Sequence, residues 1–155
     1  MASATTAVNV KVRRIEARDR RRWQVLWEGY CAFYKVDLRG AVTEHTWKRV
    51  MEKDGPVRAI VAETKADGVI GIANYVIHEH TWSLTPACYL QDLFVDPKTR
   101  AKGVGKQLID WLVDEVKARN WSRLYWATAE TNYRARGLYD KYTPHSGFLR
   151  YVINF

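Results

Sequence analysis

The chain has 155 residues, of which 47% are hydrophobic and 27% charged, and this size and composition fit one globular domain with its own core. No apolar run approaches the ~20 residues that a membrane span requires, which argues against a membrane protein. The net charge of +8 fits either a plain basic surface or a protein that attracts phosphate-bearing ligands, such as a nucleic acid or a nucleotide.

The first half of the chain alternates between strand and helix patterns. Alternating valines mark a first strand, and aromatic residues from Trp23 to Tyr34 then recur at helical spacing. The pair Asp67-Gly68 is typical of a hairpin turn. The predicted elements of this half are a strand over residues 8–15, helices over 18–34 and 43–53, and strands over 57–63 and 69–78.

The second half contains a strand–helix–strand pattern. Its predicted elements are a strand over residues 89–95, a helix over 104–119, a strand over 124–128, a helix over 132–142 and a last strand over 148–155. Antiparallel hairpins followed by a crossover predict a mixed α/β (α+β) fold with about four helices around a sheet of about six to seven strands. We expect one domain over residues 1–155, with a last strand that could pair across a dimer.

The first residues of the chain and its two cysteines bear on where in the cell the protein is found. Residues 1–7 are small and polar, so we expect them to be disordered, and they lack the charged start and apolar middle of a secretory signal. Cys31 and Cys88 are too few for a disulfide framework and do not form a Cys-x-x-Cys pair. We therefore expect an intracellular, cytoplasmic protein, or a nuclear one in a eukaryote.

A glycine-containing loop joins the strand that ends at Val95 to the following helix. Its glycines, Gly103 and Gly105, let the backbone come close to a ligand. The first N–H groups of the helix are unpaired, and the positive end of the helix dipole faces the loop. With Arg100 and Lys102 beside them, these groups predict an anion site that suits a pyrophosphate.

Two common phosphate-binding motifs do not match this loop. A Walker loop needs glycine where Arg100 stands and Ser or Thr where Gln107 stands, so it is rejected. A dinucleotide-binding fingerprint needs a third glycine where Leu108 stands, and its strand normally comes first in the domain. That interpretation is weak.

A third pattern fits better. Arg100-x-x-Gly103-x-Gly105, after a strand ending in Val-Asp-Pro, resembles the GCN5-related N-acetyltransferase (GNAT) superfamily, and so does the Asn-x-x-Ala-x-x-x-Tyr segment at residues 132–139. The aromatic helix and residues 89–95 are similar to the branch of fungal histone and polyamine acetyltransferases and, more distantly, of diamine acetyltransferases. The resemblance covers about four fifths of the chain and is densest in residues 89–142, the half expected to bind acetyl-CoA.

The resemblance implies acetyl-CoA as the donor substrate, with no metal. Main-chain groups of residues 93–95 would bind the acetyl group and the pantetheine arm, residues 100–106 the pyrophosphate, and Asn132 and Ala135 the pantetheine side. Tyr139 would protonate the departing thiolate. The expected donor-binding residues are Leu93, Phe94, Val95, Arg100, Ala101, Lys102, Gly103, Val104, Gly105, Lys106, Asn132 and Ala135.

The base that deprotonates the acceptor is less clear. Diamine acetyltransferases carry Glu-Asp where this chain has Gln91-Asp92, and glutamine cannot act as a base. Asp92 remains a candidate catalytic residue, but adjacent strand residues face opposite ways. The alternative is that Asp92 orients the substrate or serves the structure.

These observations predict an enzyme that transfers acetyl directly from acetyl-CoA to a primary amine: a polyamine or diamine, a lysine side chain or an amino-acid amine. His78 and His80 share a strand face, but no third ligand follows at metal spacing. We expect acetyl-CoA and an amine as partners, in a homo-oligomer, and no membrane. The rivals are a non-catalytic acyl-CoA-binding protein and a nucleic-acid-binding module with Arg13 to Arg22 as its footprint, and the second is less favoured.

Overall fold

Strands with alternating or continuous apolar residues build one curved sheet of five strands in the order β1-β2-β3-β4-β5. The computed structural model describes residues 8–99 and 101–155. The strands are β1 (Lys11–Arg14), β2 (Val57–Thr64), β3 (Gly68–His78), β4 (Ala87–Val95) and β5 (Arg123–Tyr125). Neighbouring strands are antiparallel except β4 and β5, which are parallel because α3 forms the crossover between them.

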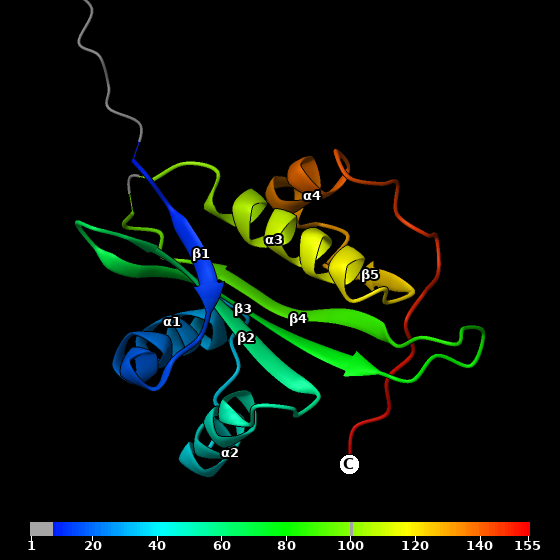
Figure 1. The fold of residues 1–155 in the computed structure, drawn as a ribbon, viewed down its shortest axis with the longest axis horizontal. Helices are drawn as coiled ribbons and strands as arrows, with labels where there is room; N and C mark the ends of the chain where they lie inside the picture. Colours follow the sequence, from blue (N-terminus) through cyan, green and yellow to red (C-terminus); the bar gives the residue numbers. More distant parts are fainter. Residues whose placement is uncertain (1–7, 100) are drawn as a thin grey trace, which may run out of the picture.

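Helices cover the two faces of this sheet (Figure 1). The helices α1 (Arg20–Phe33) and α2 (Gly40–Met51) lie on one face, after a short 3-10 turn, η1 (Ala17–Asp19). The helices α3 (Val104–Ala118) and α4 (Tyr133–Tyr139) lie on the other. The hairpin half of the chain and the crossover half thus share one sheet, as the sequence predicts.

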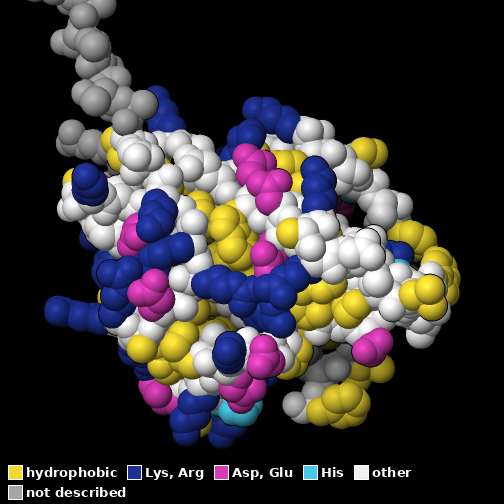
Figure 2. All heavy atoms as spheres, viewed as in Figure 1, with side chains coloured by type: hydrophobic (Ala, Val, Ile, Leu, Met, Phe, Trp, Pro, Cys, Tyr) yellow, Lys and Arg dark blue, Asp and Glu magenta, His cyan; other side chains and the backbone are white. Residues whose placement is uncertain are grey.

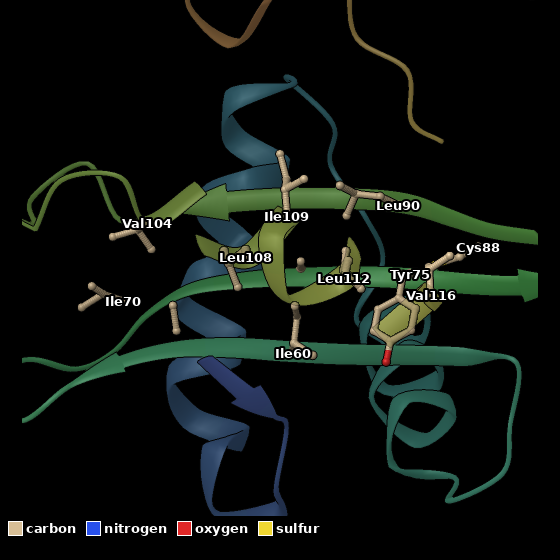
Figure 3. Close-up of a cluster of buried hydrophobic side chains, with 12 residues drawn as sticks. Ile60, Ile70, Tyr75, Cys88, Leu90, Val104, Leu108, Ile109, Leu112 and Val116 are labelled. Carbon is tan, nitrogen blue, oxygen red and sulfur yellow. The ribbon is translucent and has the colours of Figure 1, made fainter. Parts of the chain in front are cut away.

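Each face has its own hydrophobic core. Under α3, fully buried residues such as Ile60, Leu108 and Leu112 pack between helix and sheet (Figure 3). Under α1, the apolar face of the helix packs Trp23 and Leu26 against the other side of the same strands. The aromatic spacing of α1 therefore serves packing, which is its usual role in an amphipathic helix.

A β-bulge in β4 reverses the direction of its side chains. Asn74 of β3 pairs with Asp92, but the next β3 residue, Tyr75, pairs with Leu90, so Gln91 has no partner across the ladder. The extra residue puts Leu90 in the core under α3, whereas Asp92 faces α1. The bulge had no signal in the sequence.

β4 and β5 separate shortly after they meet. Their pairing is confined to residues 87–89 of β4 and 123–125 of β5. Within the described residues, the edge of β4 from Gln91 to Val95 therefore has no strand on its β5 side. Backbone N–H and C=O groups on an open strand edge are free to bind an extended ligand.

The predicted last strand is wrong, and this explains why the sheet has five strands and not six or seven. In residues 148–155 the structure places no strand, and the side chains of Phe148, Leu149 and Tyr151 are 93%, 81% and 90% exposed. A segment becomes a strand only beside a partner edge, and local alternation alone does not supply one. β5 and α4 are likewise shorter than predicted, whereas α2 begins three residues earlier, at Gly40.

Candidate active site

The start of α3 presents free backbone donors beside two lysines. Gly103 is the N-terminal capping residue in the left-handed conformation, with φ of 73°, and no side chain in the described part of the chain caps the helix. The first helical hydrogen bond runs from the Gln107 N–H to the Gly103 carbonyl, over 3.0 Å. The preceding N–H groups of residues 104–106 therefore lack acceptors within α3 and are free to bind an anion, with exposed Lys102 beside them. Lys106 is also exposed, and its ammonium group pairs with Asp110 at 2.6 Å. Arg100 lies outside the described residues.

Asp96 anchors the loop that leads to this site. Its carboxylate accepts a hydrogen bond from the Lys98 N–H at 2.9 Å, and its other oxygen pairs with the Arg22 guanidinium of α1 at 3.2 Å. The Nε–H of Arg22 also donates to the Val69 carbonyl, over 3.0 Å. Arg22 thus ties the loop to α1 and the sheet, a role that its place in an arginine run did not suggest.

The second matching segment lies next to the first. Asn132 is the residue before α4, where its carbonyl accepts from the Arg136 N–H over 3.0 Å and its side chain donates to the Thr128 hydroxyl over 3.0 Å. A methyl group added to Gly105 would lie 3.7 Å from Leu138 and 3.9 Å from Leu93. The start of α3 therefore contacts both α4 and the open edge of β4, which brings the two motifs together.

Tyr139 ends α4 in a partly buried position. Its ring packs edge-on against Trp126, with centroids 5.4 Å apart. Burial, with a smaller effect of Tyr34, raises the pKa of the Tyr139 phenol above its usual value. Tyr139 therefore keeps its proton at neutral pH. A thiol has a usual pKa of about 8.5, which is below that of this phenol, so a thiolate takes the proton only where the site tunes the two groups.

The two residues of the Gln91-Asp92 pair have opposite environments. Gln91 is exposed at the bulge. Asp92 is buried and accepts a hydrogen bond from the Asn74 side-chain amide over 3.1 Å. Burial raises the pKa of Asp92, and hydrogen bonds from Asn74 and the Tyr30 hydroxyl only partly offset this. A buried carboxylate of raised pKa is a suitable proton acceptor near neutral pH.

The sequence of this chain matches a known protein family. The model of the acetyltransferase (GNAT) family matches residues 20–143, which is most of the chain. This chain belongs to the acetyltransferase (GNAT) family.

Individual GNAT proteins agree with this assignment. The D-amino-acid N-acetyltransferase HPA3 of Saccharomyces cerevisiae is 31% identical over 133 residues, covering 85% of this chain and 83% of that protein. The crystal structure of the ribosomal-protein-alanine N-acetyltransferase from Brucella melitensis biovar Abortus superposes with a TM-score of 0.74 at 22% identity, covering 95% and 100% of the two chains. That of the aminoglycoside N-acetyltransferase AAC(6')-Iy in complex with CoA gives 0.75 at 18% identity, covering 98% and 97%. The likeness to the two solved structures shows the fold.

The arginine cluster near the N-terminus of this GNAT protein is largely neutralised. Arg13 pairs with buried Asp19 at 2.8 Å and with Glu63 at 2.7 Å, and Arg14 pairs with Glu115 at 2.7 Å. Arg18, Arg20 and Arg22 also have acidic partners. Basic and acidic side chains are accordingly interspersed on the face seen in Figure 2. An arginine held by a carboxylate is a poor phosphate ligand, which weakens the nucleic-acid interpretation.

Two further expectations can be compared with the structure. Within residues 8–99 and 101–155, no cluster of three or more His, Cys, Asp and Glu side chains could hold a metal ion. No helix in the same part of the chain has the length and apolarity needed to cross a membrane.

Proposed function

We propose that this acetyltransferase transfers the acetyl group of acetyl-CoA to a primary amine in a direct ternary complex. The observation that carries the proposal is that the free N–H groups at the start of α3 lie beside Leu93 of β4 and Leu138 of α4, where β4 has no strand on its β5 side. Asp92 of β4 and Tyr139 of α4 are the titratable groups of these two elements. The family match and the CoA bound in the AAC(6')-Iy structure support the choice of donor.

The donor-binding assignments follow from where the backbone is free. The N–H groups of residues 103–106 and the side chains of Arg100, Lys102 and Lys106 would hold the pyrophosphate. The open edge of β4 at Leu93, Phe94 and Val95 would pair with the pantetheine arm as an added strand does. Asn132 and Ala135 at the start of α4 would line its other side.

The acceptor amine is an ammonium ion at neutral pH, and it first loses one proton to Asp92, which passes it to solvent. The amine nitrogen then attacks the thioester carbon, the C–S bond breaks, and the thiolate takes a proton from Tyr139. The second proton that leaves the nitrogen returns through solvent to the Tyr139 phenolate. We propose no covalent enzyme intermediate: burial raises the pKa of Cys88 to about 12 and also raises the pKa of Cys31, so both thiols stay protonated and unreactive.

A hollow between α1 and α2 supports a cationic acceptor. Its volume is about 400 Å³, and its lining residues include Glu28, Asp37 and Glu44, of which Glu44 is paired with Arg20. Cys31 of α1 also lines it. Acidic residues at this hollow would attract a cationic amine locally, although the net charge of the chain is +8. The similarity to a D-amino-acid N-acetyltransferase favours an amino-acid amine among the candidates.

An amine panel tests the proposal. The purified chain is incubated with acetyl-CoA and polyamines, lysine-containing peptides, and L- and D-amino acids. The free thiol of released CoA is measured with a colorimetric thiol reagent, and the acetylated product is identified by mass spectrometry. We expect thiol release matched by product for at least one amine. CoA binding without turnover for every amine would instead identify a non-catalytic acyl-CoA-binding protein.

A homodimer and a cytoplasmic location remain proposals. The exposed apolar side chains of residues 148–155 and the open outer edge of β5 support a dimer in which this segment contacts a second copy. The free thiols of Cys31 and Cys88 support a reducing compartment.

A further inference from the structure

Lys106 lies in the first turn of α3, beside the N–H groups that would bind the donor pyrophosphate, but its side chain is engaged elsewhere. Its ammonium group pairs with the Asp110 carboxylate at 2.6 Å. Asp110 is four residues further along α3, which is about one turn from the helix start. A cation that suits a phosphate is therefore held by a carboxylate on the side of the same helix.

A second element holds that carboxylate in place. Tyr142, in the turn that follows α4, donates its hydroxyl to Oδ1 of Asp110 over 2.6 Å, and the same hydroxyl lies 3.2 Å from the Lys106 carbonyl. Lys106 binds the other carboxylate oxygen, Oδ2. The Tyr142 ring packs edge-on against Trp126, with centroids 6.2 Å apart. Both oxygens of Asp110 thus have partners, and this fixes its orientation more firmly than in an ordinary surface ion pair.

The pair is charged but weak enough to be exchanged. Burial raises the pKa of Asp110, but hydrogen bonds from Lys106 and Tyr142 lower it by more, so the carboxylate is ionised at neutral pH. The side chains of Lys106 and Asp110 are 58% and 42% exposed, and exposed ion pairs contribute little stability. A pyrophosphate with two negative charges is a stronger partner for an ammonium group than one carboxylate is.

We propose that Asp110 is a positioning residue, which competes with the donor pyrophosphate for Lys106 and thereby limits the affinity for CoA. The inference rests on the proposed acetyl-CoA donor. When the pyrophosphate binds at the start of α3, Lys106 leaves Asp110 and contacts the phosphates, so breaking the ion pair opposes binding. Tyr142 keeps the carboxylate in place, and Lys106 returns to it when CoA leaves.

A limited affinity suits an enzyme that must release CoA in every cycle. Acetyl transfer changes only the thioester end of the donor, so the product keeps the phosphate contacts that the substrate made. Product release is the slow step in many enzymes. An alternative partner for Lys106 within α3 would favour that release without weakening the free N–H groups of the helix.

The test is a double-mutant cycle, in which calorimetry gives the Kd for CoA at low ionic strength, where surface charges are least screened. Its variants are Asp110→Asn, Lys106→Gln and the combination of both. Asparagine keeps an oxygen that can accept from Tyr142, so the tie between α4 and α3 is retained. The control is Asp114→Asn, which removes the same charge from an exposed residue on the same side of α3, one turn further on. Melting temperatures report whether each variant keeps the fold.

We expect Asp110→Asn to lower the Kd for CoA by about threefold to fivefold, the range that loss of an exposed ion pair allows. Asp114→Asn should lower it by less than about 1.5-fold, because its charge lies further from the phosphates. Lys106→Gln should raise the Kd, and adding Asp110→Asn to that variant should bring no gain. The gain from Asp110→Asn should be the same with 3′-dephospho-CoA, which keeps the pyrophosphate.

Several results would contradict the inference in different ways. An unchanged Kd in Asp110→Asn, or an equal gain in Asp114→Asn, would end the competition for Lys106. A gain that persists beside Lys106→Gln would show that Asp110 only repels the donor. A gain with CoA that disappears with 3′-dephospho-CoA would move the Lys106 contact to the 3′-phosphate and overturn the pyrophosphate assignment.

The same measurement separates the inference from the proposed function. No binding of CoA by the unaltered chain would overturn the proposed donor and the inference together. Binding of CoA with the expected cycle, but without turnover for any amine, would overturn only the proposed acetyl transfer.

Discussion

At the scale of single residues, Asp92 carries the largest conflict between stability and proposed chemistry. Its folded-state pKa is raised by burial, so the carboxyl ionises more readily in the unfolded chain than in the folded one. The cost of ionising it in the fold therefore appears as the pH rises above the unfolded pKa of about 3.9, and it is complete above the folded pKa. The buried carboxyl of Asp92 therefore makes the folded protein less stable at neutral pH than at a pH below the unfolded pKa.

Replacement of Asp92 by asparagine should separate the two roles. Asn74 could then turn its unpaired Oδ1 toward the new amide, so the hydrogen bond between the two side chains would be kept without a buried charge. We expect Asp92→Asn to lose at least about 100-fold in kcat, as expected for a lost base. Its urea unfolding midpoint at pH 7 should equal or exceed that of the unaltered chain, and its advantage should shrink toward pH 4. A marked loss of stability would assign Asp92 a structural role instead.

Tyr139 makes the complementary prediction for the acid. Tyr139→Phe keeps the ring that packs on Trp126 and removes only the hydroxyl. We expect kcat to fall by about 100-fold, while the Kd for acetyl-CoA measured by calorimetry stays within about threefold. Equal effects on kcat and Kd would indicate that the hydroxyl binds the donor and does not protonate the thiolate. Tyr142→Phe is not a neutral control, because Tyr142 donates to Asp110 at 2.6 Å and fixes α4 to α3.

At the scale of elements, the conformation of the α3 start decides donor binding. Gly103 has φ of 73°, where a side chain costs about 1 kcal/mol, and its replacement would also turn the free N–H groups away from a common point. We expect Gly103→Ala to raise the Kd for acetyl-CoA by about tenfold, since each misaligned donor to a charged phosphate loses about 1.5 kcal/mol.

Gly147 offers a matched control for this element. Its φ is 78°, and a methyl group on either glycine would meet nothing within 4 Å. Gly147→Ala should therefore carry similar backbone strain, visible as a similar fall in melting temperature, with an unchanged Kd for acetyl-CoA. If both variants weakened donor binding alike, general destabilisation would explain the effect and the anion site would not.

At the scale of the whole molecule, the distribution of charge and of exposed apolar residues matters more than their totals. The +8 net charge includes an arginine cluster that is mostly held in ion pairs. The exposed apolar residues concentrate in residues 148–155, beyond the last helix and next to no strand. Exposed apolar segments of this kind often mark contacts with another chain.

The C-terminal segment should therefore control the oligomeric state. We expect size-exclusion chromatography with light scattering to give a dimer for the full chain, and a monomer for a chain that ends at Gly147. Replacing Leu149, Tyr151 and Ile153 by serine at full length should have the same effect as the truncation. A monomeric full chain would end the dimer proposal and leave the proposed acetyl transfer untouched.

The sequence by itself determined the mixed α/β fold and the order of its elements up to α4, and it predicts an anion site at the start of α3. These features depend on local chemistry: apolar periodicity, turn residues, and two glycines before a helix with unpaired N–H groups. It also pointed to Tyr139 and Asp92 through residue type and spacing, since these lie in segments that resemble a known family.

Only the tertiary structure decided how these residues meet. The bulge at Gln91 turns Asp92 toward α1, and no residue type signals a bulge. Asn74 lies 18 residues before Asp92 in the chain, so their contact follows from the pairing of β3 with β4. The last predicted strand was wrong for the same reason, because a strand depends on a partner edge that local sequence does not encode.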